Sequence, residues 1–392
     1  MADNAPGNAS RLNTKSLHHW LINHCADAPC LALTAFTNKD YGTIGYRLVQ
    51  TSMPRPAALP MRSATIDAAK GIAIVLVVYG HCLRGLTVAG LIDDRSWLQV
   101  TDYVIYSFHM PLFFFVSGLF VRASIARGAM HFWRGKVLTI LYPYVLWSLL
   151  QGSVQIALAG SGVTNRTLPL SALFEIFWAP ISPFWFLYAL FFALVAAYLT
   201  RRSRPELLMG LALAAFLATL SANPQILNDI AYGTFYLALG MVVSERGWIA
   251  LADRAKKTAT ASSVFLFAVI VSACYIANLP ERLTIPAAFS GIAATIMLCA
   301  LLCRRLPAAA SLLALLGQAS MAIYVMHILA LGFVRFILAK VAGVTDAAFL
   351  LMACTAAGVI IPVLAQVVLS RMQIARVFGL PPVMIMGATA RA

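Results

Sequence analysis

The segment Lys70–His81 reads KGIAIVLVVYGH, an apolar run with a cation at its start and an imidazole at its end. It opens a mainly hydrophobic stretch that continues to about Gly90. A bilayer-spanning helix needs about 20 mostly apolar residues, so this stretch predicts a transmembrane helix. Ionisable side chains are costly inside lipid, and each one within such a helix is therefore a candidate functional residue.

The whole chain has the composition of a membrane protein. Of its 392 residues, 61% are hydrophobic and 11% are charged, whereas soluble domains average about 45–50% apolar and 25% charged residues. From Gly71 onward the charges lie in short islands between apolar runs. This pattern predicts an all-α, polytopic transmembrane helix bundle of about ten spans. The spans are expected at residues 70–90, 103–121, 137–158, 181–199, 206–221, 226–244, 258–277, 285–303, 311–339 and 347–369.

The distribution of basic residues predicts the orientation. The second, fourth, sixth and eighth loops hold 13 lysines and arginines, whereas the odd-numbered loops hold four. Because cytoplasmic loops are enriched in Lys and Arg, we expect the even loops and both termini in the cytoplasm. The expected location is the bacterial inner (plasma) membrane, crossed many times.

The net charge of +15 does not indicate nucleic-acid binding. Basic residues beside transmembrane ends explain it, and no RNP, zinc-finger or helix-turn-helix pattern accompanies them. The seven cysteines are scattered and form no CxxC pair, so no disulfide framework and no metal site is expected.

The first sixty residues differ from the rest. Residues 1–60 are polar and mixed, without a sustained hydrophobic period, and are expected to be disordered. The alternative is that the gene start is over-extended, because the sequence from Met61, MRSATIDAAKG, is typical of the beginning of an inner-membrane protein. The transmembrane domain is then expected at 61–375, and a cytoplasmic tail at 376–392.

Helix geometry relates Lys70 to His81. Eleven residues correspond to 1100°, about 20° from three full turns, so both side chains lie on one face about 16 Å apart along the axis. Asp67, one turn before Lys70, can offset the lysine charge. A cation at the cytoplasmic end and a base near mid-membrane would suit a long anionic donor that enters from inside. Lys70 as a topology anchor is an equally good interpretation of the same spacing.

Further polar groups occur in three other spans. His109 and Ser117 lie in the second span, and Trp185 lies at the external end of the fourth. The ninth span carries SMAIYVMH, in which Ser320, Tyr324 and His327 share one helical face. Such groups can bind substrate, but they can equally hydrogen-bond neighbouring helices or form an interfacial aromatic belt.

Five segments in register resemble the integral-membrane acyltransferase-3 family, whose members O-acetylate glycans. The resemblance covers roughly residues 62–369 and rests on these motifs: IDAAKGIAIVLVVYGH, FHMPLFFFVSGLF, LYPYVLWSLL, PFWFLYALFF and SMAIYVMH. It implies ten spans, a cytoplasmic acetyl-CoA donor and a glycan acceptor on the periplasmic side. The family's basic residue and histidine fall on Lys70 and His81. The family's arginine pair before the third span is replaced by Arg134 and Lys136 in FWRGKVLTILYPY.

The resemblance leads to a hypothesis of membrane O-acyl transfer. His81 would act as general base, or carry a transient acetyl group, with Lys70 and Asp67 as its catalytic partners. Lys70, Arg134 and Lys136 would bind acyl-CoA, a co-substrate rather than a bound cofactor. The acceptor would be a glycan or a lipid-linked saccharide, oriented by His109, Ser117, Trp185, Ser320, Tyr324 and His327. A transporter or flippase of a small metabolite or lipid-linked sugar is the alternative.

Overall fold

A computed structural model describes residues 31–38, 43–50, 63–93, 96–161, 163–164, 167–221 and 225–382. The chain divides into two units, Met1–Met61 and Arg62–Ala392. The first contains a hairpin of two antiparallel strands, β1 (Leu31–Asn38) and β2 (Thr43–Gln50). The strands lie within residues 1–60, for which the sequence predicts disorder, and the segment TIGYRLVQ has a period-two apolar pattern that favours a strand. The other residues of that prediction lie outside the described ones.

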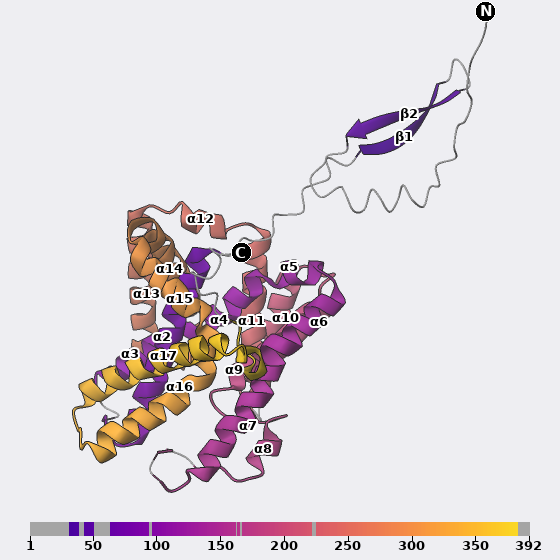
Figure 1. Ribbon diagram of the computed structural model, residues 1–392. Coiled ribbons are helices and arrows are strands. Elements are labelled where there is room, and N and C mark those ends of the chain that lie inside the picture. The colour runs from indigo at the N-terminus through magenta and orange to yellow at the C-terminus, as the bar shows by residue number, and fades with distance from the viewer. Residues whose placement is uncertain are drawn as a thin grey trace, which may run out of the picture. The chain divides into compact units, whose positions relative to one another are not determined.

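Helices are the regular elements of the second unit in its described residues, and turns and loops join them (Figure 1). Its elements are α2 (Ala64–Val88), α3 (Leu98–Tyr106), α4 (His109–Leu119), α5 (Val121–Ala126), α6 (Ala129–Lys136), η1 (Val137–Leu141), α7 (Tyr142–Ala157), α8 (Ala172–Glu175), α9 (Trp185–Leu199), α10 (Pro205–Ala218), α11 (Ile226–Glu245), α12 (Ile249–Asp253), α13 (Lys257–Ile276), η2 (Glu281–Leu283), α14 (Ile285–Arg305), α15 (Pro307–Gln318), α16 (Ser320–Arg335), η3 (Phe336–Val341), α17 (Ala347–Arg371) and η4 (Ala375–Phe378).

The prediction of an all-α polytopic bundle is confirmed. Within the described residues, eight helical segments are long and apolar enough to cross a membrane. Three shorter apolar helices, α9, α10 and α15, have 15, 14 and 12 residues. Each of the ten expected spans coincides with one helix or with consecutive helices. The ninth span, expected at 311–339, is divided between α15 and α16 at Ala319.

Glycines bring α2 and α15 into close contact. A Cβ atom at Gly71 of α2 would overlap the carbonyl oxygen of Leu313, and one at Gly317 of α15 would overlap the carbonyl oxygen of Asp67. Small residues of this kind let helix backbones approach within a membrane. Gly118 of α4 is equally close to α11, because a Cβ atom there would overlap the carbonyl oxygen of Leu237.

Two spans are interrupted beside a proline. The second expected span breaks between Tyr106 and His109, where α3 ends and α4 begins, with Pro111 in the first turn of α4. In the third span the π-helical segment η1 precedes Pro143, which cannot donate a backbone hydrogen bond. The first break fixes the position of His109 at the start of a helix.

The first residues of the predicted cytoplasmic tail are hydrogen-bonded to α7. The Tyr142 hydroxyl and the Trp147 indole N–H of α7 donate to the carbonyls of Val377 and Phe378, at 2.5 and 2.9 Å. The described tail residues, up to 382, are therefore held against the bundle, and the prediction for 383–392 lies outside the described residues.

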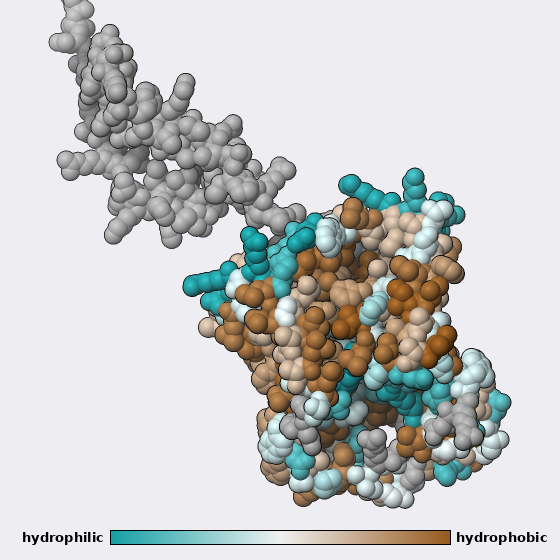
Figure 2. Space-filling view, turned by 180° about the vertical axis from the view of Figure 1, so that it is seen from behind, coloured by the Kyte–Doolittle hydropathy of each residue, from teal (hydrophilic) through white to brown (hydrophobic). Residues whose placement is uncertain are grey.

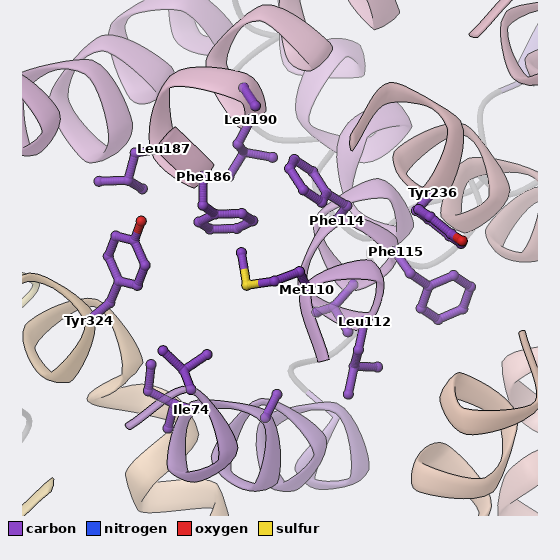
Figure 3. Packing of buried hydrophobic residues seen from close by; sticks show 14 of the residues in the cluster. Ile74, Met110, Leu112, Phe114, Phe115, Phe186, Leu187, Leu190, Tyr236 and Tyr324 are labelled. Atoms are coloured by element: carbon purple, nitrogen blue, oxygen red, sulfur yellow. The ribbon is translucent and has the colours of Figure 1, made fainter. Parts of the chain in front are cut away.

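The spans pack around an aromatic and aliphatic core. Figure 3 shows Phe114 of α4, Phe186 of α9 and Tyr324 of α16 converging above Ile74 of α2. The outer surface carries a broad apolar region with hydrophilic residues at its edges (Figure 2). Phe265 of α13, for example, is 71% exposed, as expected for a side chain that faces lipid.

Segments predicted to share one side of the membrane lie at the same end of the bundle. Figure 1 shows α5, α6 and α12, from the second and sixth loops, at one end, and α8, from the third loop, at the other. We call the end that contains α8 the α8 end.

Candidate active site

A cavity of about 920 Å³ lies between α2, α7, α16 and the segment that leads to α9. Four of the residues singled out from the sequence line it: His81, His109, Trp185 and Tyr324. They come from four different helices, α2, α4, α9 and α16. Its lining also includes residues from the C-terminal half of α2 and from α8, so the cavity belongs to the α8 end of the bundle.

His81 faces a second imidazole. The ring centroids of His81 and His327 lie 5.1 Å apart, with 51° between the ring planes. His81 is partly exposed to the cavity, whereas His327 is completely buried behind it. The last residue of the SMAIYVMH motif, in the ninth span, therefore lies next to the histidine of the first span.

The hydrogen bonds of His327 fix its tautomer. Its Nδ1 lies 2.7 Å from the carbonyl oxygen of Tyr324 and 3.1 Å from that of Ile323. Carbonyl oxygens only accept, so Nδ1–H is the donor, and in the neutral ring Nε2 keeps a lone pair. This Nε2 atom is buried and has no hydrogen-bond partner among the described residues.

His109 is arranged in the same way. It is the first residue of α4, and its Nδ1 donates to the carbonyl oxygen of Ile105 at 2.7 Å. Its ring meets the edge of Tyr106 at a centroid distance of 4.6 Å. The bond leaves the lone pair of the neutral imidazole on Nε2, so His109 can act as an acceptor in the cavity.

Arg84 is a functional candidate that the sequence interpretation missed. It follows His81 by three residues on α2 and lines the same cavity. Its guanidinium donates to Asp102 of α3 at 2.7–3.0 Å and to Glu281 of η2 at 3.1 Å. It also stacks 3.3 Å from the ring centroid of Tyr106. The signal was available, because an arginine within a span and one turn from a histidine is itself an ionisable intramembrane residue.

The Arg84 cluster connects α2 and α3 to η2, the short helix that contains Glu281. Asp102 is 6% exposed, so its charge depends on the guanidinium. Burial raises the pKa of Glu281, although the nearby Arg84 charge opposes that shift. The Tyr106 hydroxyl is buried and makes no hydrogen bond within the described part of the chain.

Tyr324 and Trp185 have structural contacts as well as positions in the cavity wall. The Tyr324 hydroxyl donates to the carbonyl oxygen of Pro183 at 2.5 Å, which ties α16 to the start of α9. The Arg282 guanidinium lies 5.8 Å from the Trp185 ring centroid and is itself paired with Asp229. Of the two alternatives drawn from the sequence, the contact between helices is present at Tyr324, and substrate binding by this cavity-wall residue stays a prediction.

Two further charged residues in the lining were also missed. Arg335 of α16 donates to the carbonyl oxygens of Gly85 and Val163, at 3.2 and 2.8 Å. Glu175 is the acidic residue of the described lining, and it belongs to α8. A short helix in a loop carries no hydrophobic period, so no sequence pattern predicts that Glu175 lines the same cavity as His81.

Lys70 and Asp67 form an ion pair away from the cavity. Lys70 Nζ lies 2.6 Å from Asp67 Oδ1, and Gln318 Nε2 of α15 donates to Asp67 Oδ2 at 3.3 Å. Neither residue is in the described cavity lining. The predicted charge compensation is thus present, at the opposite end of α2 from Arg84.

The remaining predicted residues are also outside the cavity lining. Ser117 donates to the carbonyl oxygen of Phe113 within α4, and Ser320 is the first residue of α16. Arg134 is exposed and Lys136 half-buried on α6, whose main contacts are with η1 and α5. The structure does not bring these two cations to Lys70 through any contact that it describes.

Comparison with known proteins gives one family match and two relatives. A family model described as an acyltransferase domain matches residues 63–366. The chain is 33% identical over 143 residues to nodulation protein NolL of Mesorhizobium japonicum, which is 36% of each chain. It is 34% identical over 131 residues to nodulation protein NolL of Sinorhizobium fredii, which is 33% of this chain and 34% of the relative. These matches span about a third of each relative's length, and no solved structure matches.

Proposed function

Because the chain belongs to the membrane acyltransferase family whose model covers residues 63–366, we propose that it moves an acetyl group from acyl-CoA to a hydroxyl of a cell-envelope or exported glycan. The proposed location is the bacterial inner membrane. The two nodulation proteins match about a third of the chain, and the glycan acceptor is the one that the resemblance to the acyltransferase-3 family implies.

The observation that carries the proposal is the cavity that His81 and His109 share. Acyl transfer to a hydroxyl needs a base that removes the hydroxyl proton within an enclosed, sparsely hydrated site. A partly exposed imidazole in the wall of a 920 Å³ cavity meets that need, because it can accept a proton and return it.

In the proposed reaction His81 removes the proton of the acceptor hydroxyl as its oxygen attacks the thioester carbon. The carbon–sulfur bond breaks, and the proton passes from His81 to the CoA thiolate, so that the products are an ester and free CoA thiol. The carbonyl oxygen needs a hydrogen-bond donor while it carries negative charge. The Tyr106 hydroxyl, buried and without a described partner, and the Arg84 guanidinium are the candidate donors.

The donor is proposed to bind from the opposite end of α2. Lys70, Arg134 and Lys136 are the candidates for the CoA phosphates, since cations pair strongly with phosphate. Trp185, Tyr324 and His109 are the candidates for orienting the acceptor, because an aromatic face and hydrogen-bonding groups together suit a sugar ring.

The test compares cell-envelope and exported glycans from a deletion strain complemented with wild-type protein, His81→Ala or His131→Ala. His131 is an exposed histidine of α6 outside the proposed machinery, so its variant controls for loss of an imidazole. We expect wild type and His131→Ala to restore a 42-dalton increment in the glycan mass, the mass of an acetyl group, and His81→Ala to lose it at equal membrane levels. A normal acetylation profile in the deletion strain, with altered export, would favour a transporter instead.

A further inference from the structure

The buried Nε2 atom of His327 is an acceptor without a donor. Its ring is fully buried, and its Nδ1–H is used by the carbonyls of Tyr324 and Ile323. Leaving a buried polar atom unsatisfied costs about 1–3 kcal/mol, so such an atom calls for a partner. The α16 backbone provides hydrogen-bond partners for Nδ1 of His327, whereas Nε2 has none among the described residues.

His81 is the neighbouring group that can supply that donor. Its ring centroid lies 5.1 Å from that of His327. At this separation, ring nitrogens that turn toward each other come within hydrogen-bonding reach, about 2.7–3.2 Å. His327 is not part of the described cavity lining, so a substrate in the cavity meets His81 first.

We propose that His327 is a positioning residue that accepts an N–H from His81 and thereby fixes the tautomer and the ring orientation of the base. The inference rests on the proposed acyl transfer at His81. One His81 nitrogen then carries the proton toward His327, and the other presents its lone pair to the acceptor hydroxyl. When His81 takes up that proton, the His327 lone pair stabilises the imidazolium, as the third group of a nucleophile–base–orienter arrangement does.

The backbone bonds of His327 make the arrangement specific. Donation from Nδ1 to two carbonyls of its own helix forces Nε2 to be the acceptor, whichever group faces it. His109 and Arg84 line the cavity with His81, and Tyr106, Glu175 and Arg335 are further charged or titratable residues of the described lining. His109 uses its own Nδ1–H in a bond to Ile105, so its Nε2 is also an acceptor and cannot replace His81 as the donor.

Two substitutions separate positioning from packing. The amide of His327→Asn reaches the position of Nδ1 and can still bond the α16 carbonyls, but it has no atom at the position of Nε2. The amide of His327→Gln reaches the position of Nε2 and can present its oxygen to His81. Full-length protein in lipid nanodiscs is assayed with acetyl-CoA and the acceptor glycan that the deletion strain identifies.

We expect His327→Asn to lower kcat on the order of 10-fold to 100-fold with KM nearly unchanged, because misorienting a base affects the chemical step. His327→Gln should recover most of that loss. In ¹⁵N-histidine NMR, His81, assigned through a His81→Gln variant, should show one tautomer in wild type and in His327→Gln, and a mixture in His327→Asn. This spectroscopic result does not depend on turnover.

Equal kcat for His327→Asn and wild type would overturn the inference, and so would an unchanged His81 tautomer. Equal losses in both variants with a lowered melting temperature would also overturn it, since they would assign His327 a packing role. These outcomes differ from failure of the proposed function, in which wild-type protein itself shows no acyl transfer.

Discussion

Lys70 Nζ lies 2.6 Å from Asp67 Oδ1, and the Asp67 side chain is almost completely buried. Removing one partner of a buried pair leaves an uncompensated charge and is strongly destabilising. We therefore expect Lys70→Met to lower the melting temperature of the purified protein and to raise the KM for acyl-CoA. The two effects need to be separated, because the first alone would reduce activity in cells.

A double variant separates them. Asp67→Asn combined with Lys70→Met removes both charges and should recover most of the lost melting temperature. If Lys70 contacts the donor, the KM for acyl-CoA remains high in the double variant. If the double variant recovers both its melting temperature and a normal KM for acyl-CoA, Lys70 has only a structural role, as the partner of Asp67.

The Arg84 guanidinium is expected to be irreplaceable by another cation. It bonds Asp102 through two nitrogens and stacks on Tyr106, a geometry that a lysine ammonium cannot reproduce. Arg84→Lys should therefore reduce kcat at least about 10-fold, as expected for a displaced hydrogen-bond donor near the reacting carbonyl. Single-turnover acyl transfer measures the effect, and Arg202→Lys, at an exposed arginine, is the control. Equal rates for Arg84→Lys and wild type would exclude Arg84 from the reaction.

The crossing of α2 and α15 should tolerate no side chain at Gly71. A Cβ there would overlap the Leu313 carbonyl, which is backbone and cannot rotate away. Overpacking of this kind costs about 1–3 kcal/mol, so Gly71→Ala should lower the melting temperature measurably in detergent. Gly210→Ala is the matched control, because no described atom beyond the nearby backbone of its own helix lies within 4 Å of a Cβ at that exposed position. An unchanged melting temperature for Gly71→Ala would mean that the helices separate more easily than this contact suggests.

The sequence predicted the helices well because lipid imposes a strong length and hydropathy constraint on each span. It also placed Lys70 and His81 on one helix, α2, since helix periodicity is local. It could not reveal that His327, 246 residues away, faces His81, because such a contact depends on how α2 and α16 pack. Arg84 could have been identified from its position in the span, whereas Glu175 could not, because α8 is a four-residue helix in a loop.

The sequence also does not show whether the three residues predicted to bind the donor lie close together. The sequence predicts one donor site for Lys70, Arg134 and Lys136, because all three are basic and are expected on the same side of the membrane. Sharing a side does not bring residues together, and α6 packs mainly on η1 and α5 while α2 packs on α15 and α17. Their common role is therefore still a prediction, which the KM of the Lys70 variants tests first.

The orientation of the bundle can be tested with single cysteines at its two ends. Ser161 lies just after α7 on the predicted outer side, and Ala250 lies in α12, in the sixth loop, on the predicted inner side; both are exposed. A membrane-impermeant maleimide applied to intact spheroplasts should label Ser161→Cys and leave Ala250→Cys unlabelled until the cells are permeabilised. The parent protein measures the background from its own cysteines, four of which are buried in the bundle. The reverse labelling pattern would mean that the His81 cavity faces the cytoplasm. Acyl-CoA would then reach His81 from the α8 end rather than from the end that carries Lys70.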